Sequence, residues 1–174
     1  LAGGRWSPAL FRDHCEAHIA EDFHSCVGLA TRLNGGFLDE WKKTIAMAVI
    51  RWRFEDATWY THLEPRIAAI VAGVPYAADF DMASLARPRV PLALVTARQG
   101  KWLLPRFHSD RVLEACAACE RLVDLPNGSH GALLSPFPPE ASGLSAELLN
   151  DPPAFDRSAL QEVDRRIAAF FRRH

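Results

Sequence analysis

The sequence predicts an α/β protein in which a helical segment, residues 1–64, precedes a strand–helix region, residues 65–174. Two continuous apolar runs of strand length, one from Ile67 to Val74 and one from Val90 to Thr96, are typical of strands buried on both faces of a sheet. Helical patterns separate and follow these runs, and strands joined by helical crossovers are parallel. A chain of 174 residues is long enough to bury a sizeable core.

The helical segment contains two expected helices. Ser7 followed by Pro8 is a good N-cap and first-turn pair, so a helix is expected from Ala9 to Ala20. The break at residues 34–36 (Asn-Gly-Gly) precedes a second helix over about residues 38–54, whose apolar residues share one face: Trp41, Ile45, Ala48, Val49 and Trp52. Together with Trp59 and Tyr60, these aromatic residues indicate either a cap over something apolar or an ordinary helical core.

The strand–helix region continues with a helix over about residues 105–118, a short strand over residues 121–125 and an amphipathic helix over residues 155–171. Three strands make a narrow sheet, with the run from Ile67 to Val74 at one edge. That run carries no charge, proline or bulge signal that would block pairing. We therefore expect the sheet to continue, either through a missing N-terminal half of the domain or through a homodimer partner at this edge.

The composition excludes several classes of protein. Twenty basic and 21 acidic residues give a net charge of -1, whereas a general nucleic-acid binder is basic. No apolar run is long enough to span a membrane, and no Gly-rich phosphate loop is present. The chain starts at Leu1 without an initiator Met or a leader pattern, so we expect further residues upstream.

Four cysteines form two close pairs. Cys15 and Cys26 flank a polar stretch, and the sequence is compatible both with a disulfide between them and with two reduced thiols. A disulfide would favour an exported protein over a cytoplasmic one. Cys116 and Cys119 lie in an apolar helical pattern, and no second CxxC completes a zinc site. The i, i+4 pair His14 and His18 has zinc-binding spacing, but a surface cluster of polar residues explains it more simply. We expect neither a metal nor a cofactor.

The most informative segment runs from Asp124 to His130 (Asp-Leu-Pro-Asn-Gly-Ser-His). A strand ends there, a Gly-containing turn follows, and His130 is presented at the carboxyl end of the strand, where ligands collect in open α/β sheets. Its pKa near neutrality suits a histidine to act as a general base. The alternative is a loop histidine whose hydrogen bonds the backbone satisfies.

The sequence resembles the C-terminal half of an α/β-hydrolase, more narrowly the predicted dienelactone hydrolase family. Residues 65–75, 80–85, 90–95 and 125–130 carry this resemblance, together with the tail segments 150–160 and 168–174. The opening Leu1-Ala-Gly-Gly is similar to the helix that follows that family's G-x-S-x-G nucleophile elbow, and residues 7–26 are similar to its inserted segment. The resemblance covers nearly the whole chain. It is specific around His130 and in the tail.

The resemblance implies an esterase-like serine hydrolase in which His130 deprotonates the serine. Three departures stand against this. No G-x-S-x-G motif is present, since Ser7 stands in Arg-Trp-Ser-Pro, so the elbow would precede Leu1. Gly100 stands where the family has its acid. Phe137 and Leu149 replace two cysteines that the family often pairs.

Asp79 or Asp81, just after the first strand, would be a substitute acid if either reached His130; otherwise they form a solvated turn and a helix cap. Two hypotheses follow. The chain is part of a hydrolase for a small ester or lactone, with its serine upstream, or it is a degenerate, non-catalytic binding module of the same fold. Gly100 favours the second hypothesis and His130 the first.

Overall fold

The structure is a computed structural model of the chain, and it describes residues 1–135 and 141–174. Short 3-10 turns connect several of the regular elements. The longer elements are β1 (Arg5–Trp6), α1 (Pro8–His18), α2 (Phe23–Val27), α3 (Asp39–Arg53), β2 (Tyr60–Thr61), β3 (Ile70–Gly73), α4 (Met82–Leu85), β4 (Leu92–Ala97), α5 (Ser109–Ala115), β5 (Glu120–Leu125), α6 (Leu144–Leu149) and α7 (Leu160–Arg173).

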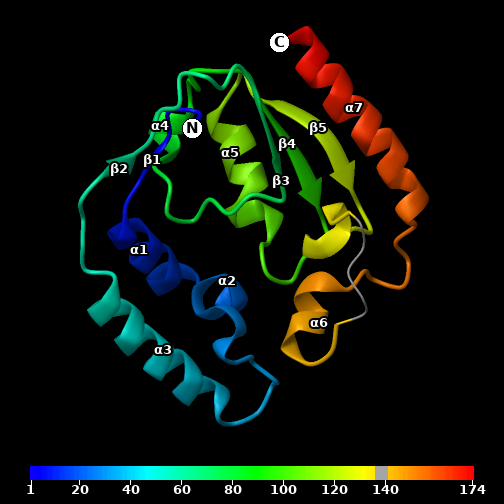
Figure 1. Cartoon of the computed structure of the whole chain (residues 1–174). Helices are drawn as coiled ribbons and strands as arrows, with labels where there is room; N and C mark the ends of the chain where they lie inside the picture. The colour runs from blue at the N-terminus through cyan, green and yellow to red at the C-terminus, as the bar shows by residue number, and fades with distance from the viewer. Residues whose placement is uncertain (136–140) are drawn as a thin grey trace.

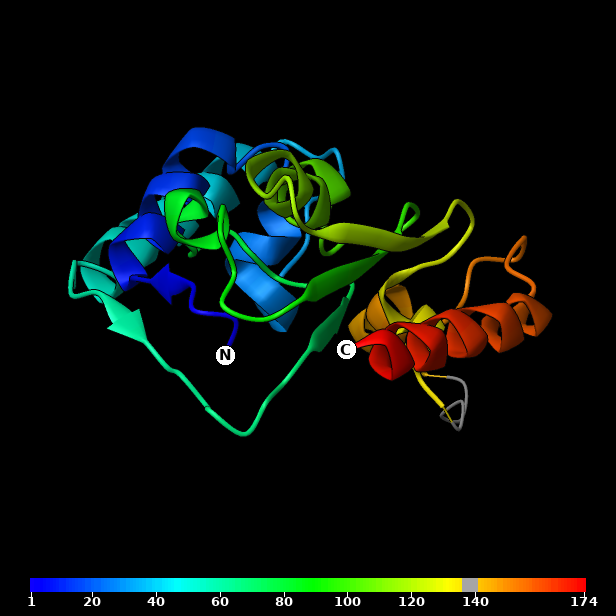
Figure 2. The ribbon, with the colours of Figure 1, turned by 90° about the horizontal axis from the view of Figure 1, so that it is seen from above.

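The fold is α/β, as the sequence predicts, with a parallel three-stranded sheet in the order β3-β4-β5. Helix α5 covers one face of the sheet and α7 the other, so the sheet is the middle layer (Figures 1 and 2). All six residues of β4 are buried, which is why this run reads as continuously apolar. Leu94 packs towards Val112 of α5, and Val95 packs towards Val163 of α7.

The strand β3 lies at an edge of this sheet. In the structure it spans Ile70–Gly73, shorter than the run from Ile67 to Val74, and it pairs in parallel with β4. Among the described residues it has no second strand partner. The expected open edge is therefore present in the part of the chain that the structure describes.

The helical segment packs beside the sheet on the α5 side (Figure 2). The Ser7 side chain accepts a hydrogen bond from the Leu10 backbone N–H at 3.2 Å and caps α1, as predicted. The disulfide between Cys15 and Cys26 ties α1 to α2, so the bridge, and not the pair of free thiols, is what the structure shows.

Two local expectations are wrong, and so is one of the two interpretations of the apolar residues shared by one face of residues 38–54. Residues 1–4 are not helical, and the short strand β1 pairs antiparallel with β2 directly after them. The Cys116–Cys119 motif does not lie inside a helix, because α5 ends at Ala115; the two cysteines form a second disulfide in the loop before β5. The outward residues of α3, including Trp41 and Trp52, do not form a core, because they are exposed to solvent.

Candidate functional site

The carboxyl ends of β3, β4 and β5 lie at one edge of the sheet, because the three strands are parallel. The segments that follow them, residues 74–81, 98–108 and 126–130, meet at this edge. Loops at the carboxyl edge of a parallel sheet commonly form binding and catalytic sites. All three candidate residues from the sequence, Asp79, Asp81 and His130, belong to these segments.

The turn after β5 holds His130 in a defined position. The Gly128 backbone N–H donates to the Leu125 carbonyl at 3.2 Å, and the Gln99 N–H donates to the Gly128 carbonyl at 2.9 Å. The Ser129 hydroxyl donates to the Asn150 carbonyl at 3.1 Å. This serine is therefore engaged with the backbone and is not a nucleophile paired with the imidazole.

The imidazole of His130 is half-buried, and its Nδ1 has no hydrogen-bond partner among the described residues. Burial lowers the pKa of His130 below its ordinary value of 6.5, so the neutral ring is favoured near pH 7. In a Ser-His-acid triad the Nε2 atom of the histidine takes the proton and the acid contacts Nδ1, so the buried, unpartnered Nδ1 of His130 is the atom that an orienting acid would contact.

Gly100, in the loop after β4, lies next to this histidine. A Cβ atom built on Gly100 would lie 3.7 Å from the His130 backbone nitrogen and 3.7 Å from the Leu103 carbonyl oxygen. These are ordinary contact distances, so a side chain at this position would fit beside His130. The loop that should carry the acid therefore reaches the histidine, but it brings no carboxylate there.

Neither substitute acid contacts His130 among the described residues. Asp81 caps α4 by accepting from the Ala83 backbone N–H, and its other oxygen pairs with Arg5 at 2.7 Å. Asp79 is half-buried, and burial raises its pKa, an effect that the nearby His108 opposes. Asp81 thus has the structural role that the sequence left as its alternative, and Asp79 lies in the surroundings of a different histidine.

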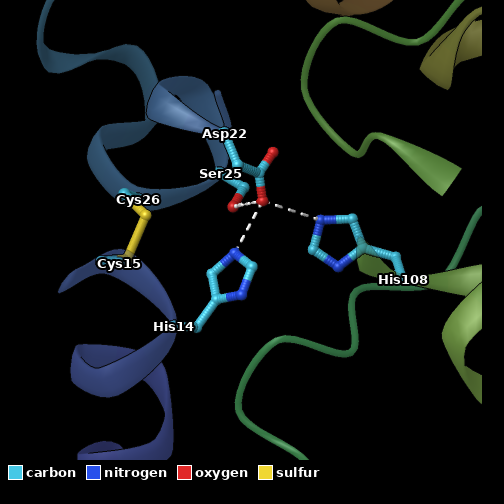
Figure 3. Close-up of a disulfide and its surroundings, with 6 residues drawn as sticks. All are labelled: His14, Cys15, Asp22, Ser25, Cys26 and His108. Carbon is cyan, nitrogen blue, oxygen red and sulfur yellow. Dashed lines mark hydrogen bonds and ion pairs between the residues drawn. A yellow bond between two sulfur atoms is a disulfide. The ribbon is translucent and has the colours of Figure 1, made fainter. Parts of the chain in front are cut away.

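That other histidine belongs to a buried cluster that we call the Asp22 cluster, made of His14, Asp22, Ser25 and His108 (Figure 3). The Asp22 Oδ2 atom accepts from the Ser25 hydroxyl at 2.6 Å, and His14 Nε2 lies 2.8 Å from the same oxygen. His108 Nε2 lies 3.5 Å from the same oxygen, longer than an ordinary N–H···O hydrogen bond. The Asp22 side chain is fully buried.

The ionisation of Asp22 follows from these contacts. Burial by itself would raise the pKa of Asp22, but His108, His14 and Ser25 outweigh burial and hold the pKa well below its ordinary value of 3.8. The Ala77 backbone N–H donates to His108 Nδ1 at 3.2 Å, so neutral His108 carries its proton on Nε2, which faces Asp22.

The Asp22 cluster joins the helical segment to the sheet region, because His14 and Asp22 come from the helical segment and His108 precedes α5. Sequence reasoning missed it: the polar run around His14 and His18 reads as a surface cluster, and nothing near His108 in the sequence points to a partner. The sequence contained one signal for this cluster. His108 directly precedes α5, the helix that follows β4, so it lies in a loop at the carboxyl edge of the sheet, where the loops converge.

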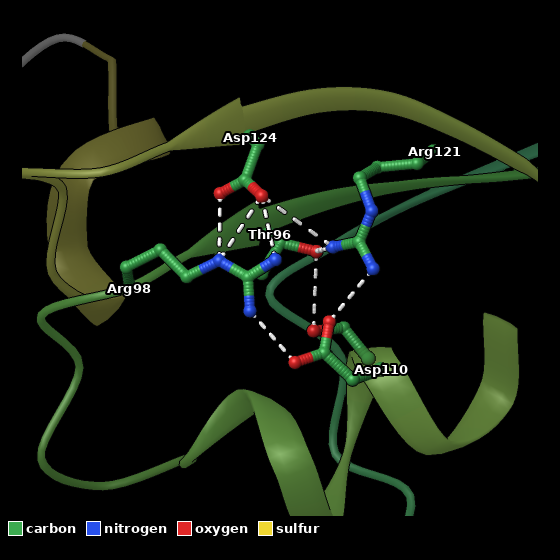
Figure 4. A network of polar contacts seen from close by, with 6 residues as sticks. Thr96, Arg98, Asp110, Arg121 and Asp124 are labelled. Carbon is green, nitrogen blue, oxygen red and sulfur yellow. Dashed lines mark hydrogen bonds and ion pairs between the residues drawn. The ribbon is translucent and has the colours of Figure 1, made fainter. Parts of the chain in front are cut away.

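A second polar network lies where β4 and β5 end (Figure 4). Arg98 donates to Asp124 at 2.8 Å and to Asp110 at 2.7 Å, and Arg121 donates to Asp110 at 2.8 Å. Both carboxylates are thus paired with arginines and hold the strand ends against α5. They are not free to orient His130.

Three further features can be compared with the structure: metal-binding side chains, membrane-spanning helices and the two positions where the family often has cysteines. Across the part of the chain that the structure describes, no group of three or more His, Cys, Asp or Glu side chains is arranged to hold a metal ion. No helix among residues 1–135 and 141–174 is long and apolar enough to cross a bilayer. Of the two positions where the family often has cysteines, Leu149 ends α6, and Phe137 lies outside the described residues.

Comparison of the chain with protein-family models, with curated proteins and with solved structures finds no match. The established description is therefore an α/β fold with a parallel three-stranded sheet, and any assignment of function depends on the geometry at its carboxyl edge.

Proposed function

We propose that this chain supplies the general base, His130, to a hydrolase that acts on a small carboxylic ester or lactone, and that the serine nucleophile lies outside these 174 residues. His130 would remove the proton of the serine hydroxyl while the serine oxygen attacks the carbonyl carbon, and it would return that proton to the departing alkoxide oxygen. Water would then release the acyl group by the same steps.

The observation that carries this proposal is the state of His130. His130 lies five residues after the end of β5, burial lowers its pKa, and its buried Nδ1 has no hydrogen-bond partner among the described residues, as expected of the nitrogen that a triad acid would contact. A loop histidine with only a structural role would have both polar atoms in contact with the backbone, water or solvent-facing groups. The resemblance to the predicted dienelactone hydrolase family adds the substrate class and the expected nucleophile.

A specific observation favours the second candidate function, a non-catalytic binding module of the same fold. The loop residue beside His130 is Gly100, and the nearby carboxylates of Asp81, Asp110 and Asp124 are paired elsewhere. An imidazole without an acid to orient it and to stabilise its charged form loses most of its catalytic effect.

The test uses the natural full-length protein and a chromogenic acetate ester. We expect His130→Ala to lower kcat/KM by about 10³-fold or more. The matched control is His62→Ala, because His62 is exposed and belongs to no interaction that this proposal uses. Equal activity of wild type and His130→Ala would reject the hydrolase role, and activity absent from both would favour the binding module.

A further inference from the structure

The disulfide between Cys116 and Cys119 lies at the amino edge of the sheet, the edge opposite to His130. Cys116 directly follows α5, and Cys119 directly precedes β5. The two cysteines are separated by two alanines, and pairs with this C-x-x-C spacing form the reactive centre of many disulfide oxidoreductases. The hydrolase proposed above makes no use of this bridge, so its role is a separate question.

The two disulfides of the chain differ in burial and in the length of the loop that they close. Cys15 and Cys26 are both buried. Cys116 is 1% exposed, but Cys119 is only partly buried, and the two alanines between them are exposed. The stabilisation that a disulfide gives by restricting the unfolded chain grows with loop length, so a separation of three residues contributes less than one of eleven. Exchange with an external thiol requires access, and the bridge between Cys116 and Cys119 provides it.

A groove beside this bridge has room for a small thiol compound. Its volume is about 320 Å³, at the lower end of the range of about 300–1,000 Å³ that is usual for small-molecule sites. The lining comes from the segment that leads into β4, the two neighbours of Cys119 and the end of α7: residues 88–92, Ala118, Glu120, Phe170 and His174. In Figure 1, α7 ends near the start of β5, and Arg173 pairs with Glu120 there at 2.7 Å.

The groove favours a ligand with negative charge. Arg89 lines it, is exposed, and has no ion-pair partner among the described residues. The Glu120 carboxylate in the lining is neutralised by Arg173. A thiol compound that carries carboxylates is therefore attracted to this groove. Glutathione, a tripeptide with two carboxylates and one ammonium group, has this chemistry.

We propose that Cys116 and Cys119 form a thiol–disulfide exchange site for a small anionic thiol of the glutathione type that binds in this groove. A glutathione thiolate attacks Sγ of Cys119, the more exposed cysteine. A sulfur–sulfur bond forms between them while the bond to Cys116 breaks, and Cys116 leaves as a thiolate that takes a proton from water. A second glutathione thiolate attacks the glutathione sulfur of the mixed disulfide and releases Cys119. Two glutathione molecules thus become one glutathione disulfide, and the bridge becomes two thiols.

The first test compares the two disulfides within one molecule. The natural full-length protein is incubated with glutathione at neutral pH, alkylated at intervals with iodoacetamide, and analysed by peptide mapping. Cys116 and Cys119 should become alkylated at least about 100-fold faster than Cys15 and Cys26, because the buried bridge reacts only after local unfolding. Equal rates, or a Cys116–Cys119 bridge that glutathione leaves intact in the folded protein, would overturn the proposal.

The second test concerns the groove. Arg89→Gln should lower the rate of reduction by glutathione about two- to five-fold, as expected for one exposed charge pair, and should leave the rate with uncharged 2-mercaptoethanol unchanged. Arg87→Gln is the matched control, because Arg87 is a nearby exposed arginine that does not line the groove. It should change neither rate. An Arg89→Gln variant that reacts with glutathione as fast as wild type would overturn the binding of the thiol in this groove.

The third test identifies the sulfur that is attacked. In Cys116→Ser the thiolate of Cys119 should attack added glutathione disulfide, form a mixed disulfide and release one glutathione thiolate. In Cys119→Ser the remaining thiol, Cys116, is buried and should react much more slowly. Mass spectrometry of the intact proteins measures both adducts. Faster reaction of Cys119→Ser than of Cys116→Ser would contradict the assignment of Cys119 as the attacked cysteine.

Discussion

Replacement of Asp22 by asparagine tests how the helical segment is held against the sheet region. The change preserves the size of the side chain and one oxygen acceptor, but it removes the negative charge that His14, Ser25 and His108 surround. Ser25 retains an acceptor, whereas the two imidazoles lose their charged partner in a buried site.

The expected cost follows from these contacts. A hydrogen bond to a charged group contributes about 1.5–3 kcal/mol to stability. Because the hydroxyl contact survives while the imidazoles lose their charged partner, we expect a loss of about 2 kcal/mol, which corresponds to a decrease in Tm of roughly 4–8 °C for a chain of this length.

The pH dependence provides a second readout. The folded-state pKa of Asp22 lies below its ordinary value of 3.8, so the unfolded state takes up the proton first. The stabilisation that the ionised Asp22 carboxylate provides is therefore complete above about pH 4, and it is lost as the pH falls through the folded-state pKa of Asp22. The stability difference between wild type and Asp22→Asn should narrow on acidification below pH 4.

The assay is urea unfolding followed by circular dichroism at pH 7 and at pH 3. Asp13→Asn is the matched control, because Asp13 is an exposed neighbour on α1 whose partner is the adjacent Arg12. The control should change stability by less than about 0.5 kcal/mol. A loss below about 1 kcal/mol for Asp22→Asn, or a difference that widens at low pH, would refute this account of the Asp22 cluster.

Three further predictions follow from the site and the covalent links. Gly100→Asp should raise the pKa of His130 above 6.5, as seen in an NMR titration of its ring protons, while Gly100→Asn should not; an unchanged pKa would mean that position 100 does not face the imidazole. Replacement of Cys15 and Cys26 by serine should cost about 3 kcal/mol in urea unfolding, because the bridge closes a loop of eleven residues, and a neutral effect would contradict this. Arg98→Ala should cost only about 1 kcal/mol in the same assay, because its ion pairs are partly exposed, and a loss above 3 kcal/mol would show that they act as a buried network.

Local features of the fold were predictable where one physical rule dominates. Ser7 before Pro8 gave the cap of α1, and the apolar run of β4 gave a strand buried on both faces. The turn after β5 placed His130 at the carboxyl edge. In each case the signal is contained in fewer than ten consecutive residues.

The remaining features depend on contacts between distant segments. Asp22 and His108 are 86 positions apart, and only the packing of the helical segment against α5 brings them together. The apolar pattern of α3 gave its helical period but not its orientation, because both of its sides are apolar and the inner side of Met47 and Ile50 took the core. The sequence could not show whether Asp79 or Asp81 reaches His130, because this too depends on how distant segments pack.

The most direct test of the proposed function is labelling of the natural full-length protein with a fluorophosphonate, which reacts with an activated serine, followed by peptide mapping. The account predicts a single labelled serine outside these 174 residues, and loss of the label in His130→Ala. Absence of labelling, or a label that persists without His130, would contradict the role of His130 as the general base and favour the binding module.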